Sequence, residues 1–268
     1  MTGLSAVRMT AQRRPAIDTV AVVLPAHNED QHIDQALRAV QRAADELHGV
    51  RPEVGIRVMV VLDSCTDRSA EIAAGYVDAD PRFDVLVVGL RSAGASRAAG
   101  IRATVLGRAY RHPGQRSTPA PWTGRTWLAN TDADSQVPPN WLVRQLEFAD
   151  AGADAVLGSV EPDPVGMDPE LLRRWLERHP FEENHPHIYG ANFGVRASAY
   201  LAAGGFSKQE SHEDRTLVQG LRGLAFTVLA TDSVRVLTSG RTQARAPQGF
   251  AAYLRSLGRQ HPPAATGS

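Results

Sequence analysis

In the first half of the chain, largely apolar runs alternate three times with segments of helical spacing, and this alternation constrains the fold most. The runs cover residues 19–24, 56–62 and 84–88. Such continuous runs are typical of strands that are buried on both faces of a parallel sheet. After the first run, apolar residues recur every three or four positions from Ile33 to Leu47, as on the buried face of a helix. The pattern predicts an α/β fold in which helices cover both faces of a mostly parallel central sheet, with right-handed crossovers.

Prolines, glycines and capping residues predict where the remaining elements begin and end. Pro25 is expected to end the first strand, and Thr66 or Asp67 to cap a helix that reaches about Tyr76. Residues 111–124 contain three prolines and two glycines, which predicts a loop. The other predicted helices cover residues 95–110, 138–151, 169–178, 197–203, 213–221 and 250–257. The other predicted strands cover residues 127–129, 155–160, 190–196, 225–229 and 234–237.

A single domain is predicted, because the sequence contains no internal repeat and no clear linker. Residues 1–18 are expected to form a flexible leader, and residues 241–268 a C-terminal loop, short helix and tail. The domain between them, residues 19–240, divides into a larger half at 19–135, where strands and helices alternate, and a smaller C-terminal half at 136–240.

The composition excludes several classes of protein. The 29 basic and 29 acidic residues leave no formal net charge, so nothing favours nucleic acid as a partner. Cys65 is the only cysteine, which excludes an internal disulfide and fits a reducing cytoplasm. No run approaches the roughly 20 apolar residues that a membrane helix requires. We therefore expect a soluble, cytoplasmic protein without a transmembrane segment; the sequence leaves its oligomeric state open.

The segment at residues 125–135, RTWLANTDADS, joins a short apolar strand to an acidic turn. In an open α/β sheet, ligands bind beyond the carboxyl ends of the strands, where this turn is expected to lie. Asp132 and Asp134 would supply the hard oxygen ligands that Mg²⁺ or Mn²⁺ prefers, and the ion would need an anionic partner such as a pyrophosphate. The alternative is a solvated turn, because aspartate favours turns for its own hydrogen bonds.

Polar residues also follow the first two strands: His27, Asn28 and Glu29 after the first, and Asp63 and Ser64 after the second. Parallel strands end at the same edge of a sheet, so a nucleotide would fit between these groups. Asp63 would accept from a ring N–H and Glu29 from ribose hydroxyls, whereas helix capping is the alternative for both. No G-x-G-x-x-G follows the first strand and no G-x-x-x-x-G-K-[ST] occurs, which disfavours dinucleotide dehydrogenases and P-loop enzymes.

Six short segments, in this order and at this spacing, resemble the family 2 glycosyltransferases, which have the GT-A fold. The resemblance extends from about residue 20 to residue 236. The segments are PAHNED at 25–30, VVLDSCTDRS at 60–69, SAGASRAAG at 92–100, NTDADS at 130–135, GANFGVRASAYLAAGGF at 190–206 and HEDRTL at 212–217.

The resemblance implies binding or catalytic roles for residues in each segment. Those that would hold the nucleotide are Pro25, Ala26, His27, Glu29, Asp63 and Ser64, with Arg97 helping to close its pocket. Asp134 would bind the metal, and Asp132 the ribose or the metal. Gly190 and Asn192 would line the sugar pocket. Asp214 would be the catalytic base, with Glu213 as its neighbour.

The implied reaction is transfer of a sugar, with inversion, from a nucleotide sugar such as a UDP- or GDP-sugar to a hydroxyl group of one acceptor. Residues 19–135 would then bind the nucleotide, and residues 136–240 the acceptor. The sequence departs from the family at Ser96-Arg97-Ala98, which lacks the asparagine often found after the arginine. It also lacks Q-x-x-R-W after Asp214, the signature of processive polymer synthases, so transfer is expected to be non-processive. Peripheral contact with a membrane through a lipid acceptor stays open.

Other interpretations compete for several residues. His179, His185 and His187 crowd one loop but match no zinc signature, and His212 is a candidate for contact with metal or diphosphate. Arg241 and Arg245 would clamp a diphosphate. The alternative is that they are ordinary surface arginines, because arginine is abundant in this chain: Lys208 is the only lysine among the 29 basic residues. The alternatives to sugar transfer are a scaffold that binds a nucleotide sugar or a partner without turnover, an aspartyl phosphohydrolase and a sugar-phosphate nucleotidyltransferase.

Overall fold

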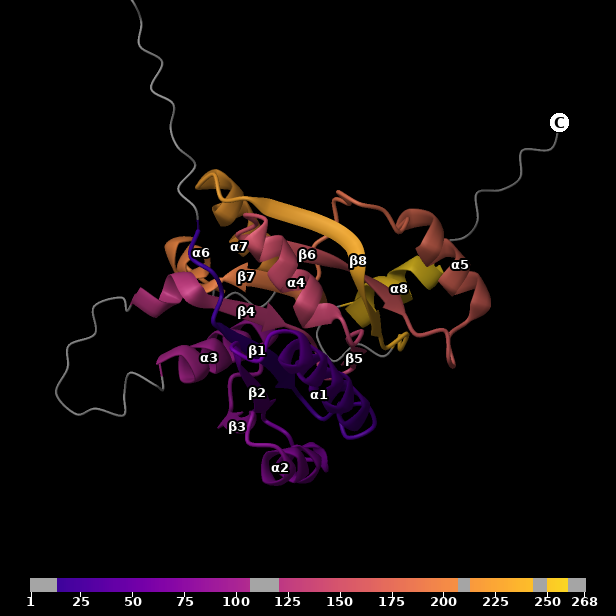
Figure 1. Cartoon of the computed structure of the whole chain (residues 1–268). Helices are drawn as coiled ribbons and strands as arrows, with labels where there is room; N and C mark the ends of the chain where they lie inside the picture. The colour runs from indigo at the N-terminus through magenta and orange to yellow at the C-terminus, as the bar shows by residue number, and fades with distance from the viewer. Residues whose placement is uncertain (1–13, 107–120, 207–212, 243–249, 260–268) are drawn as a thin grey trace, which may run out of the picture.

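The computed structural model describes residues 14–106, 121–206, 213–242 and 250–259, and its strands form one eight-stranded sheet (Figure 1). The strand order is β3-β2-β1-β4-β7-β6-β8-β5. The strands β3, β2, β1 and β4 are parallel, as are β6 and β8, whereas β7 runs antiparallel to β4 and β6. The mostly parallel sheet is therefore confirmed. The strands are β1 Thr19–Ala26, β2 Gly55–Asp63, β3 Phe83–Val88, β4 Thr126–Asn130, β5 Ser135–Gln136, β6 Ala155–Pro162, β7 Phe193–Arg196 and β8 Val228–Thr238.

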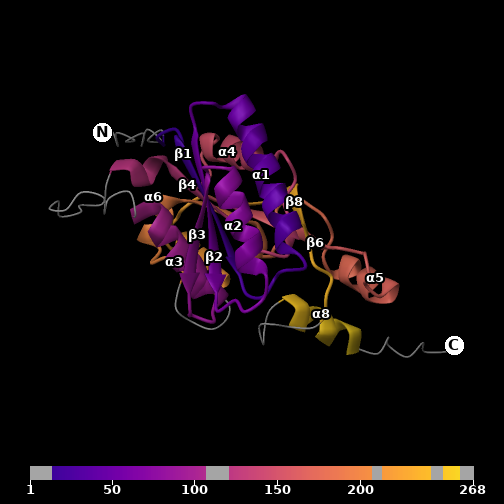
Figure 2. The same cartoon turned by 90° about the horizontal axis from the view of Figure 1, so that it is seen from below.

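Helices cover both faces of the sheet (Figures 1 and 2). The side chains of β1 belong alternately to the cores on its two sides. Val20, Val22 and Leu24 pack with α1, α2 and α4, whereas Ala21 and Val23 pack with α3, α6 and α7. A strand with two buried faces must be apolar throughout, which is why the sequence of β1 shows no alternation. The helices are α1 Ile33–Val50, α2 Ser69–Ala79, α3 Ala93–Leu106, α4 Trp141–Asp150, α5 Pro169–Arg178, α6 Ala197–Ala202, α7 Glu213–Gly223 and α8 Phe250–Arg259, with short 3₁₀ turns η1 Pro121–Arg125 and η2 Gly190–Asn192.

Two predicted strand boundaries were wrong. Pro25 does not end β1, because β1 pairs with β4 only as far as Val23 and with β2 as far as Ala26. At Pro25 the missing N–H therefore costs no bond to β4. The strands predicted at 225–229 and 234–237 are a single strand, β8, which crosses an irregularity in its pairing with β6.

The remaining differences concern the ends of helices. Arg68 precedes α2, although the carboxylate of Asp67 still accepts a hydrogen bond from Ser69 N at 3.0 Å. Helix α4 begins at Trp141 rather than 138, and residues 190–192, predicted as strand, form η2. The predicted loop at 111–124 includes η1, and its residues 111–120 lie outside the described part, as does 107–110 of the predicted helix.

Residues 14–18, expected to belong to a flexible leader, pack against the domain. Ile17 is buried, Asp18 N donates to Arg125 O at 2.9 Å, and Arg196 donates to Pro15 O at 2.8 Å. Residues 1–13 lie outside the described part.

Helices α5 and α8 pack on each other beyond β6 and β8, far from β3 (Figure 2). They share a small core formed by Leu171, Trp175, Leu254 and Leu257. Among the helices that the structure describes, none has the length and apolar character needed to cross a membrane.

Candidate active site

The loops after β1 and β2 are bound to each other. His27 Nδ1 lies 2.6 Å from Asp63 O, and Asn28 Oδ1 accepts from Thr66 N at 2.7 Å. Asn28 and Ser64 both have a φ of 54°, a left-handed conformation that non-glycine residues adopt only where surrounding contacts enforce it. The two strand ends predicted to hold a nucleotide therefore form one rigid edge.

Asp63 is buried at this edge and accepts hydrogen bonds from the turn that leads from β3 to α3. Its carboxylate accepts from Leu90 N, Arg91 N and Ser92 N at 2.8–3.1 Å and from Ser96 Oγ at 2.8 Å. Burial alone would raise the pKa of Asp63, but these hydrogen bonds outweigh it and lower the pKa. Asp63 thus holds the turn together, and contact with a nucleotide base stays a prediction.

Arg97 on α3 connects the acidic turn after β4 to the start of α7. Its guanidinium donates to the carboxylate of Asp132 and, at 2.9 Å, to Glu213 Oε1. The Arg97 side chain is only 4% exposed. Burial alone would lower the pKa of Arg97, but the charges of Asp132, Glu213 and Asp214 outweigh it and raise the pKa. Arg97 is thus enclosed between two carboxylates, and its predicted role in closing a nucleotide pocket stays a prediction.

Arg241, which follows β8, binds the carboxylates at the ends of β1 and β4. Its Nη1 and Nη2 lie 2.7 and 2.8 Å from the two carboxylate oxygens of Glu29, and Nη2 lies 2.9 Å from Asp134 Oδ2. Burial and the charge of Asp132 raise the pKa of Asp134 to about 6, against a smaller opposing effect of Arg241. Four carboxylates, those of Glu29, Asp132, Asp134 and Glu213, contact the two guanidinium groups of Arg97 and Arg241.

This donor set fits a divalent cation that is shared with a substrate. Asp132 and Asp134 provide carboxylate oxygens, and Mg²⁺ is commonly held by one or two carboxylates together with substrate phosphates and water. Within the described ranges, no three His, Cys, Asp or Glu residues are grouped to hold a metal by themselves. The remaining ligands would therefore have to come from outside these acidic side chains. Both aspartates are paired with an arginine, Asp132 with the buried Arg97 and Asp134 with the more exposed Arg241.

Asp214 and Glu213 open α7 but differ in their surroundings. Glu213 is buried and bonded to Arg97, and a Cβ at Gly94 would lie 2.4 Å from its Cγ, so α3 approaches it closely. Asp214 is half-buried, and its Oδ1 accepts a local hydrogen bond from Arg215 N at 2.7 Å. Of the two, Asp214 has the carboxylate that is accessible to an acceptor.

Asn192 does not line a pocket with its side chain, contrary to the prediction. The residue is 1% exposed. Its amide accepts from Trp141 Nε1 at 2.9 Å and donates to Ser159 O and Val234 O at 2.8 and 2.7 Å. The amide joins α4, β6 and β8, because η2 turns it into the core. Gly190, at the start of η2, instead lies against Arg97.

The histidines of the loop before η2 form an aromatic cluster rather than a metal site. His179 stacks on Trp175, with ring centroids 4.5 Å apart, and His187 lies 4.6 Å from His179. His212 and Arg245 lie outside the described residues.

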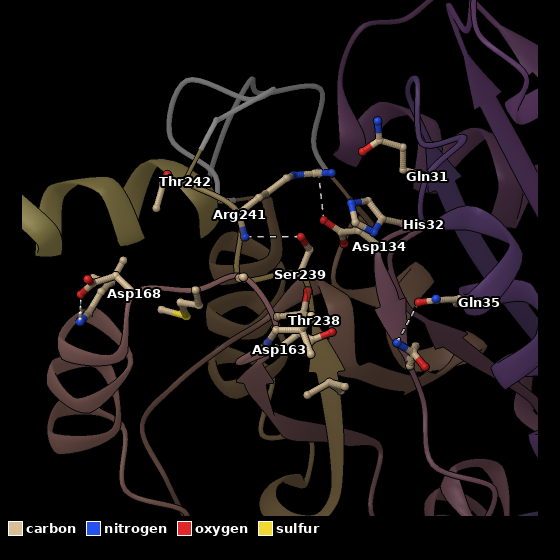
Figure 3. A pocket seen from close by; sticks show the side chains of 17 residues that line it. Gln31, His32, Gln35, Asp134, Asp163, Asp168, Thr238, Ser239, Arg241 and Thr242 are labelled. Atoms are coloured by element: carbon tan, nitrogen blue, oxygen red, sulfur yellow. Dashed lines mark hydrogen bonds and ion pairs between the residues drawn. The ribbon is translucent and has the colours of Figure 1, made fainter.

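A cavity of about 960 Å³ opens beside Asp134 and Arg241 (Figure 3). It lies between the start of α1, the end of β8 and the segment before α5. Most of its polar lining is uncharged; the amide and hydroxyl side chains are Gln31, Gln35, Gln136, Thr238, Ser239 and Thr242. Sequence reasoning missed these residues, because they come from separate segments and form no motif.

A family model and a characterised relative both relate this chain to sugar transferases. The sequence model described as Glycosyl transferase family 2 matches residues 21–200. The undecaprenyl-phosphate 4-deoxy-4-formamido-L-arabinose transferase of Pseudomonas aeruginosa is 28% identical over 162 residues, which are 60% of this chain and 40% of that protein. This chain thus spans less than half of the length of that relative.

Solved structures share the fold at low sequence identity. The mannosyltransferase of Pyrobaculum calidifontis in complex with GDP-Man and Mn²⁺ has a TM-score of 0.57 and 17% identity, over 93% of this chain and 66% of that one. GalNAc-T7 with UDP, GalNAc and Mn²⁺ has a TM-score of 0.57 and 13% identity, over 86% of this chain and 46% of that one.

Proposed function

The chain belongs to glycosyl transferase family 2 and has the GT-A fold, and from this we propose that it uses a divalent cation to transfer a sugar from a nucleoside diphosphate sugar to one acceptor hydroxyl. The observation that carries this proposal is the convergence of Glu29, Asp132, Asp134 and Asp214 at the carboxyl edge of the sheet, with two arginines between them. This edge is where open α/β sheets bind nucleotides. A phosphohydrolase and a nucleotidyltransferase are set aside by the family.

Each group has a distinct role in the proposed reaction. Mg²⁺ or Mn²⁺, bound chiefly through Asp134, would offset the negative charge that develops on the departing diphosphate. Asp214 would take the proton of the acceptor hydroxyl while its oxygen bonds to the anomeric carbon and the bond from that carbon to the diphosphate breaks. Attack from the face opposite the diphosphate inverts the configuration.

The proposed donor is a UDP- or GDP-sugar held between the loops after β1 and β2. Two structures of the same fold were solved with GDP-Man and Mn²⁺ and with UDP and Mn²⁺, which supports this class of ligand. Pro25, Ala26, His27 and Ser64 would contact it at the rigid edge, where Glu29 would reach the ribose once Arg241 releases it.

A phosphate acceptor is a second candidate, because the relative from Pseudomonas aeruginosa is named for transfer to undecaprenyl phosphate. The chemistry of the two acceptors differs. A phosphate monoester is already ionised near neutral pH, so its attacking oxygen needs no base, whereas a hydroxyl group does. The dependence of transfer on Asp214 therefore distinguishes the two acceptors.

Thermal unfolding with UDP-, GDP-, ADP- and dTDP-sugars, each with and without Mn²⁺, tests the donor and the metal. A donor at about 100 times its Kd stabilises the native state by about 2.7 kcal/mol, which corresponds to roughly 5–10 °C in Tm for a domain of this size. We expect one class of nucleotide sugar to give this shift only with Mn²⁺. If none stabilises the protein under any condition, the proposal fails.

A further inference from the structure

The two aspartates of the acidic turn are each paired with an arginine, but only one of these arginine side chains has space to move. Arg97 is 4% exposed and enclosed beneath Gly190. The Arg241 side chain is 24% exposed and follows the last strand, at the wall of the cavity (Figure 3). The cavity gives the guanidinium of Arg241 space to leave the carboxylates, whereas Arg97 has no such space.

The guanidinium of Arg241 occupies a position between carboxylates at which a metal ion would be stabilised. It lies within 2.7–2.9 Å of three oxygens, two from Glu29 and one from Asp134. One positive charge therefore faces two carboxylates. A divalent cation would match the charge of this pair, but it cannot bind at Asp134 in the same place while the guanidinium is there.

Arg241 also has unused capacity for hydrogen bonds. Its Nε is buried and has no partner among the residues that the structure describes. A diphosphate presents several anionic oxygens, and guanidinium groups bind such oxygens through two parallel hydrogen bonds. Transfer of Arg241 from carboxylates to a diphosphate would thus preserve its charge pairing.

We propose that Arg241 holds the cation position beside Asp134 and Glu29 when no donor is bound, and exchanges these carboxylates for the donor diphosphate when the metal enters. This inference rests on the proposed function, in which a metal-bound nucleoside diphosphate sugar is the donor. The metal alone then has to displace an ion pair, whereas the metal together with a diphosphate gives Arg241 a new partner. Binding of the metal and the nucleotide is therefore coupled through Arg241, and coupling of this kind is reciprocal.

The test is a titration with Mn²⁺, followed by the electron paramagnetic resonance signal of the free ion, with and without UDP or GDP. In Arg241→Met, without nucleotide, we expect Mn²⁺ to bind about tenfold more tightly than in the wild type, because no ion pair has to break. The enhancement of Mn²⁺ affinity by the nucleotide should shrink by a similar factor. Arg144→Met removes the same charge from an exposed i,i+3 pair on α4 and should match the wild type in both measurements.

Arg241→Gln keeps a hydrogen-bond donor without the charge and serves if Arg241→Met unfolds; it should show the same two changes. Unchanged or weaker binding of Mn²⁺ alone by the Arg241 variants would overturn the exchange, even if the wild type binds nucleotide and metal together. Failure of the wild type to bind either nucleotide would count against the proposed function instead. The titration without nucleotide would still decide whether Arg241 competes with the metal.

Discussion

Gly190 lies so close to Arg97 that a Cβ at position 190 would be 2.9 Å from the guanidinium carbon. Real Cβ atoms do not approach other atoms so closely, so a side chain here requires Arg97 to move. Arg97 has no room to do so, because it is buried between Asp132 and Glu213. The ion pairs that connect β4 to α7 therefore require a residue without a side chain at the start of η2.

Gly190→Ala is expected to destabilise the protein by about 1–3 kcal/mol, the usual effect of overpacking. It should also weaken nucleotide binding with Mn²⁺, because Asp132 loses its fixed partner. Urea denaturation measures the first effect, and titration with nucleotide the second. Gly75→Ala is the matched control, because Gly75 lies within α2 with nothing within 4 Å of its added Cβ, and alanine there should stabilise by about 0.5–1 kcal/mol. Equal stability of the two variants would refute the steric role of Gly190.

Substitutions of the two carboxylates at the start of α7 should have different effects, one on catalysis and the other on stability. Asp214→Asn is expected to leave stability within about 0.5 kcal/mol, because Asp214 is half-buried and its bond to Arg215 N is local. Transfer to a hydroxyl acceptor should fall by about 10²–10⁴-fold, the usual contribution of a general base. Donor binding, measured by the same thermal shift as in the wild type, should persist.

Glu213→Gln gives the complementary result. It replaces a buried, charge-assisted bond to Arg97 by a neutral one, so we expect a loss of about 1–3 kcal/mol in unfolding free energy. If Asp214→Asn transfers sugar to a hydroxyl acceptor at the wild-type rate, Asp214 is not the base. Full activity with a phosphate-terminated acceptor alone would identify the second candidate reaction.

The sequence predicted one aspect of the candidate site, namely which strand ends meet at the same edge of the sheet. Asp63, Asp132 and Glu29 follow apolar runs, and the parallel pairing of β1 with β2 and β4 brings these ends together. The pairing of Glu29 with Arg241 joins residues 212 positions apart and leaves no periodic or local signal. Such contacts depend on the path of the chain after β8, which short patterns do not specify.

The direction in which a side chain points could not be predicted from the sequence either. Asn192 belongs to the segment that resembles the family, yet its amide faces the core, because three residues predicted as strand form a 3₁₀ turn. Strand periodicity assigns faces by alternate residues, and a single turn changes that assignment.

Asn192→Ala should therefore act on stability. The change leaves the indole N–H of Trp141 and the carbonyl groups of Ser159 and Val234 without their partner in the core. We expect a loss of about 2–4 kcal/mol in unfolding free energy, measured with urea. The control is Asn140→Ala, because Asn140 is exposed and its side chain does not cap α4, so its effect should stay within about 0.5 kcal/mol. A variant of Asn192 that is stable but has a raised KM for the donor would restore the predicted sugar contact.

The histidine cluster should make the protein sensitive to mild acid. Burial, reinforced by the nearby His179 and His185, lowers the pKa of His187 to about 4, whereas an unfolded histidine has a pKa near 6.5. Between these values the unfolded chain binds the proton more readily, so the stability contributed by neutral His187 is present above pH 6.5 and is lost as the pH falls towards 4.

His187→Phe keeps a ring against His179 and removes the titrating group. We expect the decrease in unfolding free energy between pH 7.5 and pH 5 to become smaller by about 1 kcal/mol, a value reduced because His187 is only half-buried. The measurement is urea denaturation of both proteins at the two pH values. His48→Phe, on the exposed end of α1, controls for loss of a histidine outside the cluster. If His187→Phe shows the same decrease as the wild type, the acid sensitivity arises elsewhere, because a neutral ring that never titrates cannot contribute to it.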